Sequence, residues 1–307
     1  MKRLPMMMIV GVCLLAAGCG APSSGALGPA PTATATAEPS SPAVSPGTGT
    51  ASAAPSPSGQ RPTATSNQGP AREIGLQAWF SRNGKLFVTK RTVPATTGIG
   101  QAALDRMLTG PSAAEYAAGL RSRIPAGTTV RGVRISAGIA TVDLSSSFES
   151  AASPSAMPLR IAQVVYTLTQ FPTVTGVRFA INGQGVTVVG GVPVQSPQTR
   201  AMYSGYLPAI TVRSPVIGAR VTSPVTVSGT ADVFEATVSV RILDSAGHEI
   251  ARTFTTASCG TGCRGDYSVT VSYSVPRTQP GTIEVFESSA KDGQPVNVQL
   301  IPVTLAR

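Results

Sequence analysis

Two short motifs near the C-terminus of the 307-residue chain have the spacing of known chemical sites. Ser288-x-x-Lys291 matches the serine nucleophile and lysine of penicillin-interacting enzymes, where the serine opens a helix beside a Lys-Thr-Gly strand. Gly260-x-Gly262-x-x-Gly265 matches a dinucleotide-binding turn, which needs a helix directly after it. The chain has no Lys-Thr-Gly sequence, and strand-like residues flank the glycines. Both motifs are therefore interpreted as turns.

Asp143 and Glu149 are the carboxylate pair best placed in the sequence for acid–base chemistry. Glycosidases hold two carboxyl groups across a cleft, but the chain has a single Trp and little else to stack a sugar. The alternative is that Asp143 ends a strand and caps the turn at 145–147. His248, the only histidine, follows Gly247 in a predicted turn and is expected to be a solvated loop residue. One histidine excludes a His-based metal cluster, and we predict no cofactor.

A group of arginines could bind an anionic partner. Its members are Arg121, Arg123, Arg131, Arg134, Arg160 and Arg178. Alternation around 130–135 puts Arg134 opposite Val133 and Ile135, toward solvent. The functional interpretation is a face that docks an anionic wall polymer, lipid headgroups or an acidic protein. The alternative is ordinary solubility of an Arg-rich protein. Nucleic acid is not an expected partner outside the membrane.

The N-terminus predicts where the protein is located. Lys2 and Arg3 precede an apolar stretch, 6–17, that is too short to span a bilayer, so residues 1–18 are predicted to be a signal peptide. The sequence LAAGC, 15–19, is similar to a bacterial lipobox, in which the cysteine receives palmitate-type acyl chains. Cys19 is therefore the predicted lipid anchor on the extracytoplasmic face of the cell membrane. An ordinary cleaved signal peptide is the alternative.

Residues 19–70 are predicted to be a disordered tether. They contain many Pro, Ala, Ser and Thr residues and few sizeable aliphatic ones. Such a segment cannot bury enough apolar area to offset its ordering entropy. As a flexible coil it would reach roughly 40 Å, and up to ~150 Å if it adopts polyproline-like structure.

The two remaining cysteines, Cys259 and Cys263, lie in a Gly-rich segment. Outside the cytoplasm they are predicted to form a small loop disulfide. A redox motif would have two residues between the cysteines rather than three, and a metal site would need more ligands. The adjacent Arg264-Gly265-Asp266 spells an adhesion tripeptide, for which chance is the better explanation.

The folded sequence divides into two modules of different charge. Residues 71–208 contain 13 Lys and Arg against five Asp and Glu, whereas residues 209–307 contain eight of each. The net charge of +10 is therefore concentrated on the first module.

Residues 71–208 combine strand and helix periodicities and predict an α+β domain. The expected strands are 74–80, 85–93, 133–135, 140–144, 177–181 and 186–189, and the expected helices are 99–109, a short one from Ser112-x-x-Glu115, and 155–170. In the last helix the apolar residues share one face, whereas Arg160, Gln163 and Thr167 lie elsewhere.

Residues 209–307 predict an all-β sandwich. Apolar residues alternate at 225–227, 238–242, 267–275 and 296–300, with turns between them. Short strands at this spacing over about 100 residues are typical of an immunoglobulin-like fold.

Several motifs in order resemble a known family. In the first module they are RTVP (91–94), LTGPSAAE (108–115), IPAGT (124–128), ATVDLSSSF (140–148) and RIAQVVYTLTQFP (160–172), and in the second VSGTADVFEATV (227–238) and CGTGCRGD (259–266). The first set resembles the GerMN domain of sporulation and spore-germination proteins, and the second resembles the immunoglobulin-like domain that accompanies it. The resemblance implies a surface lipoprotein of sporulation-protein ancestry and supplies no catalytic residues.

The leading hypothesis is a non-enzymatic, membrane-anchored lipoprotein of the cell envelope with a binding or assembly role. One alternative is an enzyme or accessory of cell-wall remodelling that acts through Asp143 and Glu149. Another is an extracellular partner of a membrane sensor. The sequence does not predict an oligomeric state.

Overall fold

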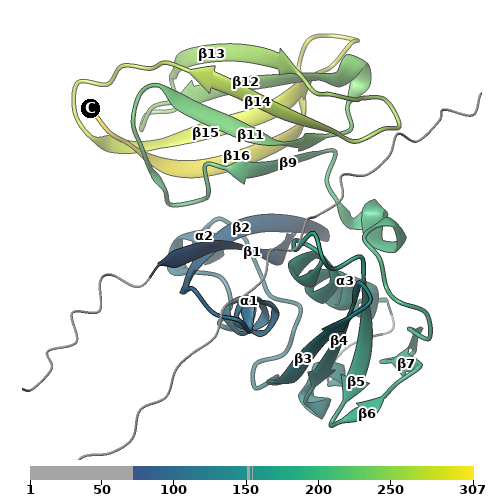
Figure 1. Cartoon of the computed structure of the whole chain (residues 1–307). Coiled ribbons are helices and arrows are strands. Elements are labelled where there is room, and N and C mark those ends of the chain that lie inside the picture. The colour runs from purple at the N-terminus through teal and green to yellow at the C-terminus, as the bar shows by residue number, and fades with distance from the viewer. Residues whose placement is uncertain (1–71, 151–152, 154) are drawn as a thin grey trace, which may run out of the picture. The chain divides into compact units, whose positions relative to one another are not determined.

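The computed structural model describes residues 72–150, 153 and 155–307 (Figure 1). The predicted signal peptide, Cys19 and the tether lie outside these residues. All described residues belong to one compact unit, Thr65–Arg307.

The first module begins with a long hairpin of β1 (Glu73–Arg82) and β2 (Lys85–Pro94), which pair antiparallel along their whole length. Asn83 and Gly84 connect the strands with φ values of 52° and 74°. Two positive φ values are required by a type I′ turn, which matches the twist of the strands it joins, and Asn-Gly is its preferred sequence. The turn residues therefore determine the register that places Arg82 opposite Lys85.

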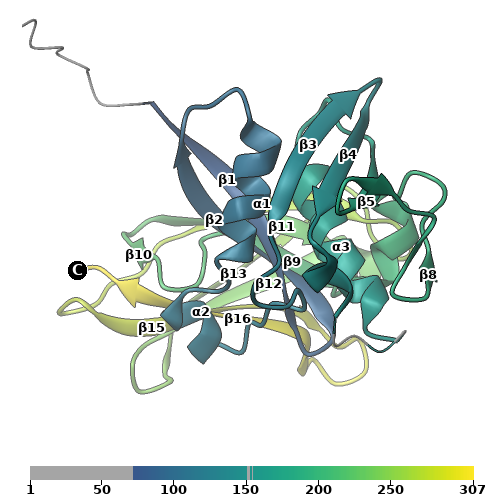
Figure 2. The same cartoon turned by 90° about the horizontal axis from the view of Figure 1, so that it is seen from below.

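A second sheet has the strand order β3-β4-β5-β6. Its strands are β3 (Val130–Ser136), β4 (Ile139–Leu144), β5 (Gly176–Ile181) and β6 (Gln184–Gly185), and the helices of the module are α1 (Ile99–Leu108), α2 (Ala113–Ala117) and α3 (Met157–Leu168). Strand β4 pairs with β5 in parallel, and α3 lies on the crossover between them. Figure 2 shows α1 between the β1–β2 hairpin and β3, in agreement with its contacts to both. The predicted α+β order is confirmed.

The polar face expected on α3 is not present. Arg160, Gln163 and Thr167 are all buried, with 5%, 0% and 0% of their surfaces exposed. The helix packs against β1, α1, β5 and the following 3₁₀ helix, η2 (Ala201–Tyr206), so every side has a neighbour (Figure 1). Gln163 bonds to the backbone of Arg123 and Trp79. Polar residues in this helix therefore bind buried backbone groups rather than water.

The strand expected at 186–189 is shorter in the structure, where only β7 (Val188–Val189) is a strand and pairs with β8 (Val192–Pro193) in a separate ribbon. Gln184–Gly185, just before the expected strand, pairs back onto the end of β5 as β6. Alternation alone does not reveal which partner such a short strand takes.

The second module is a sandwich of two sheets, as predicted. One sheet has the order β10-β16-β15-β12-β13 and the other β14-β11-β9. The strands are β9 (Ile210–Ser214), β10 (Arg220–Val221), β11 (Val225–Ala231), β12 (Thr237–Leu243), β13 (Glu249–Thr256), β14 (Gly265–Val271), β15 (Gln279–Ser288) and β16 (Pro295–Leu305). Inward residues of both sheets, including Val227, Val240 and Ile283, are fully buried.

The loop before β14 contains a disulfide between Cys259 and Cys263, with their Cα atoms 5.5 Å apart.

Buried side chains of both modules belong to one continuous hydrophobic cluster. Polar contacts accompany it: Arg82 donates to the Leu300 carbonyl and the Gln299 side chain.

Candidate functional site

Two of the predicted docking arginines lie in one row across the four-stranded sheet, with a threonine between them. Arg134 on β3 is opposite Thr141 on β4, and Thr141 is opposite Arg178 on β5. Residues directly opposite each other in neighbouring strands project from the same face. All three are exposed, whereas the alternating residues Ala140 and Val142 are buried. The sheet therefore presents two guanidinium groups on its outer face.

Arg131 borders this face beside a bulge in β3, but its charge is partly neutralised. Its Nε lies 3.4 Å from Oδ2 of Asp143. The other oxygen of Asp143 accepts a hydrogen bond of 2.9 Å from the Gly183 N–H, in the turn between β5 and β6. Asp143 thus holds that turn, and the sequence interpretation that it caps the turn at 145–147 is wrong.

Glu149 supports a different turn. Its Oε1 accepts a 3.0 Å hydrogen bond from the Gly190 N–H, between β7 and β8. Asp143 and Glu149 therefore each bind a backbone amide of a separate turn. The structure therefore gives each member of this pair a local structural role.

Arg121 and Arg123 contact the end of β1 rather than the outer sheet face. Arg121 lies over the ring of Tyr116, 3.6 Å from its centroid, and its backbone forms a bridge with Ser81. Arg123 donates from Nε to Oγ of Ser81 at 3.0 Å. Each side chain has a local partner, and both residues remain exposed.

Arg160 was expected in the docking group, and the structure contradicts this. Its guanidinium donates to three carbonyl oxygens, those of Arg123 at 2.7 Å, Phe148 at 2.6 Å and Ser150 at 2.9 Å. Burial lowers the pKa of Arg160 from its ordinary value, because the charged form loses hydration. Arg160 therefore donates hydrogen bonds to backbone carbonyls of nearby loops, a role that helical periodicity cannot reveal. Because it is buried, it is not available to a partner.

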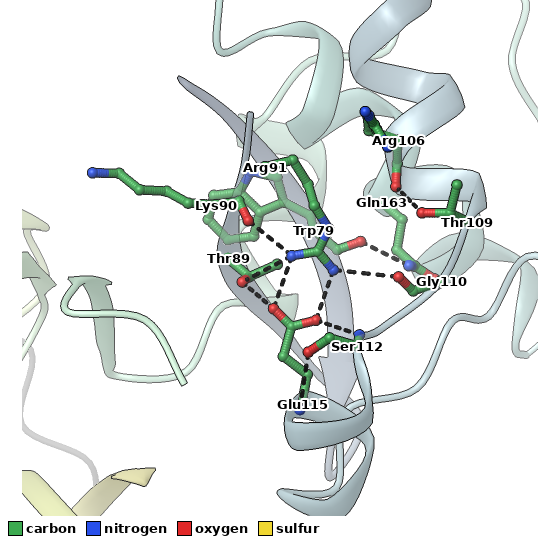
Figure 3. Close-up of polar contacts among 10 residues, drawn as sticks. All are labelled: Trp79, Thr89, Lys90, Arg91, Arg106, Thr109, Gly110, Ser112, Glu115 and Gln163. Atoms are coloured by element: carbon green, nitrogen blue, oxygen red, sulfur yellow. Dashed lines mark hydrogen bonds and ion pairs between the residues drawn. The ribbon is translucent and has the colours of Figure 1, made fainter. Parts of the chain in front are cut away.

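A buried ion pair joins β2 to α2 (Figure 3). Arg91 on β2 donates to both carboxylate oxygens of Glu115, at 2.9 and 2.6 Å. Thr89 donates to the same carboxylate, and so does the backbone N–H of Ser112, whose hydroxyl in turn accepts from the Glu115 N–H. The sequence predicts the capping box of Ser112 and Glu115 but not its ionic partner on a distant strand.

Hydrogen bonding determines the ionisation of Glu115. Burial by itself would raise the pKa of this carboxyl group, but bonds from Arg91, Thr89 and Ser112, with the Arg91 charge, outweigh burial and lower the pKa. The group is held ionised and fully bonded. It is therefore a structural connection between β2 and α2 rather than a proton donor.

The other sequence motifs lie at strand ends and in turns. Ser288 ends β15 with its hydroxyl 3.4 Å from that of Ser239, and His248 is exposed in a turn beside Asp244. In the adhesion-like tripeptide, Arg264 donates to the Pro208 carbonyl at 2.6 Å. Within the described residues no His, Cys, Asp and Glu side chains gather as a metal site would require. The same residues include no helix with the length and apolar character of a membrane span.

Two family models match consecutive parts of the chain. Residues 79–187 match the family described as sporulation and spore germination, and residues 209–294 match the immunoglobulin-like domain of bacterial spore germination. These ranges correspond to the α+β module and the sandwich. No curated protein matches the chain.

Among solved structures, the first GerMN domain of the sporulation protein GerM from Bacillus subtilis is 27% identical, covering 42% of this chain and 98% of that one, with a TM-score of 0.37. The tandem GerMN domains of the same protein are 17% identical, with coverage of 76% and 61% and a TM-score of 0.37. A putative lipoprotein from Clostridium perfringens is 19% identical, with coverage of 42% and 89% and a TM-score of 0.32. The resemblance of this chain to sporulation and germination proteins rests on the two family models.

Proposed function

Given that this chain is a GerM-like sporulation and germination protein with an immunoglobulin-like C-terminal domain, we propose that it is a non-enzymatic binding or assembly protein of the cell envelope. The observation that carries the proposal is the row formed by Arg134, Thr141 and Arg178 on the outer sheet face. The carboxylates with the best spacing for catalysis, Asp143 and Glu149, each hold a backbone turn instead.

The partner that best fits this face is an anionic wall polymer. Residues 71–208 contain thirteen Lys and Arg against five Asp and Glu, so this module attracts anionic polymers over a long range. Arg134 and Arg178 then provide two exposed positive charges on one face for contact with the polymer. Because both side chains are exposed, their contribution should be screened by salt over a length of about 10 Å at 0.1 M.

Attachment to the membrane through Cys19 is part of the proposal. The apolar stretch 6–17 and the sequence up to Cys19 have the pattern of a lipoprotein signal. A Cys19→Ala protein should appear in the medium, whereas the unaltered protein should fractionate with membranes. Retention of Cys19→Ala in the membrane fraction would contradict lipid anchoring.

Co-sedimentation with purified cell walls tests the docking face. An Arg134→Gln/Arg178→Gln protein should bind several-fold more weakly than the unaltered protein at low salt, and the difference should shrink at high salt. The matched control is Arg220→Gln/Arg277→Gln, which removes the same charge from exposed positions of the sandwich. Equal losses in the two variants would indicate a general charge effect and would overturn the assignment of this face.

A further inference from the structure

One pocket in the described residues is lined by three arginines and is separate from the outer sheet face. Its volume is about 890 Å³, and side chains from β1, α3, η2 and the sandwich border it. The residues that matter for its chemistry are Trp79, Tyr166, Arg200, Arg213, Asp232 and Arg264. Because the pocket uses none of the proposed docking residues, its function goes beyond wall docking.

Arg200 is held in place with part of its donor capacity unused. Its Nε donates to Oγ1 of Thr169 at 2.8 Å and its Nη2 donates to the Tyr166 carbonyl at 2.9 Å. The guanidinium lies over the Tyr166 ring, 4.7 Å from its centroid. Within the described residues, Nη1 has no acceptor. Arg200 is only partly buried and lines the pocket.

Burial disfavours the charged forms of Arg200 and Arg264 in the pocket. Burial lowers the pKa of Arg200; the nearby Tyr166 opposes this shift, and the charge of Arg213 adds to it. Burial also lowers the pKa of Arg264, whose Nη atoms donate to the carbonyls of Pro208, Ala209 and Thr230. An anion in the pocket would relieve both the lost hydration and the repulsion between like charges.

The lining also contains an acceptor. Oδ1 of Asp232 accepts a 2.8 Å hydrogen bond from the Gly262 N–H, and Oδ2 accepts from none of the described residues. A ligand with several separate acidic groups would place one of them near this carboxylate and be repelled by it. A ligand with one acidic group and several hydroxyl groups could use the arginines and the carboxylate at once.

Trp79 also lines the pocket. Its indole Nε1–H is buried and is one of two buried side-chain polar atoms without a partner in the described part of the chain. Buried Trp N–H groups usually have an acceptor, because leaving one unpaired costs its desolvation energy. The faces of Trp79 and Tyr166 are buried, so they offer no stacking platform and recognition must be polar.

We propose that this pocket binds a sugar that carries a single acidic group, with the acid on Arg200 and Arg213 and a sugar hydroxyl on Asp232. The acid could be a phosphate, as in a sugar phosphate, or a carboxylate, as in an acidic sugar of a glycan chain. The two sources share the anion and the hydroxyl-rich body.

The single Trp makes fluorescence a direct assay, because Trp79 lines the pocket. Glucose 6-phosphate and glucuronic acid, titrated separately into the purified protein, should change the emission saturably for at least one of them. The stronger of the two identifies the acid. Glucose and inorganic phosphate alone should bind at least about tenfold more weakly, because each lacks half of the recognised groups.

The test variant is Arg213→Gln, since Arg213 is partly exposed and pairs with Asp266 at the surface, so its loss should leave the fold intact. Affinity should fall about tenfold, as expected for loss of a charge-assisted hydrogen bond, with an unchanged melting temperature. Arg220→Gln is the matched control. No saturable response to either anionic sugar, equal binding of inorganic phosphate, or equal effects of the two variants would overturn the proposal.

Discussion

The ion pair of Arg91 and Glu115 allows a quantitative test of how the first module is held together (Figure 3). In Arg91→Met the aliphatic part of the side chain is retained and the charge is lost. Glu115, whose side chain is only 3% exposed, would then keep its bonds from Thr89 and Ser112 but lose both bonds from the guanidinium. Removing one partner of a buried pair costs about 3–5 kcal/mol.

We expect the lower end of that range, because the Arg91 side chain is 16% exposed and two donors remain on the carboxylate. A loss of about 3 kcal/mol corresponds to a decrease in melting temperature of roughly 6–12 °C for a folded unit of this size. Calorimetry on the purified protein measures it. Arg106→Met is the matched control, because Arg106 is an exposed arginine near the same cluster.

The double variant Arg91→Met/Glu115→Leu separates the ion pair from packing. With both charges absent, no buried carboxylate is left without its cation, so at least half of the lost stability should return. A decrease below 2 °C in Arg91→Met, or a double variant as unstable as the single one, would refute the reasoning.

Four further outcomes are expected. The pKa of Glu115 is lowered in the folded protein, so its stabilising effect is complete above the ordinary value of 4.5 and is lost as pH falls below it; thermal melts should show a shallower acid decline for Glu115→Gln. Arg160→Met leaves three carbonyls without their donor and should cost about 3 kcal/mol in urea unfolding, whereas an effect within 0.5 kcal/mol would contradict its burial. Intact mass should be two hydrogens below the reduced value for Cys259–Cys263, and reduction should cost about 2 kcal/mol because the loop is short. In Gly229→Ala the new methyl group would meet the backbone of β9, so this protein should melt several degrees lower; an unchanged melting temperature would show that β9 can move.

Local features were predictable because their causes are local. Asn83-Gly84 determines its turn through two positive φ values, and Ser112 with Glu115 closes a capping box within one helical turn. The apolar positions of 157–168 likewise predict a helix close to its observed bounds. Each of these depends on residues within a few positions of one another.

The exposure of individual arginines was only partly predictable. Alternation correctly placed Arg134 toward solvent, because a strand side chain follows the period of its own strand. Arg160 was placed wrongly, because a helix face is polar only if nothing packs against it, and loop carbonyls from residues 123–150 cover that face.

The amino-acid sequence by itself determined the two folded modules, their fold classes, the concentration of positive charge in the first and the resemblance of both modules to sporulation and germination domains, because these follow from composition, periodicity and short motifs. Only the tertiary structure decided which charges are free. Arg91 meets Glu115, Arg160 meets three carbonyls, and Arg200, Arg213 and Arg264 line one pocket although 64 residues of sequence separate the first from the last. Such groupings depend on where distant segments pack, and no local pattern in the chain encodes that.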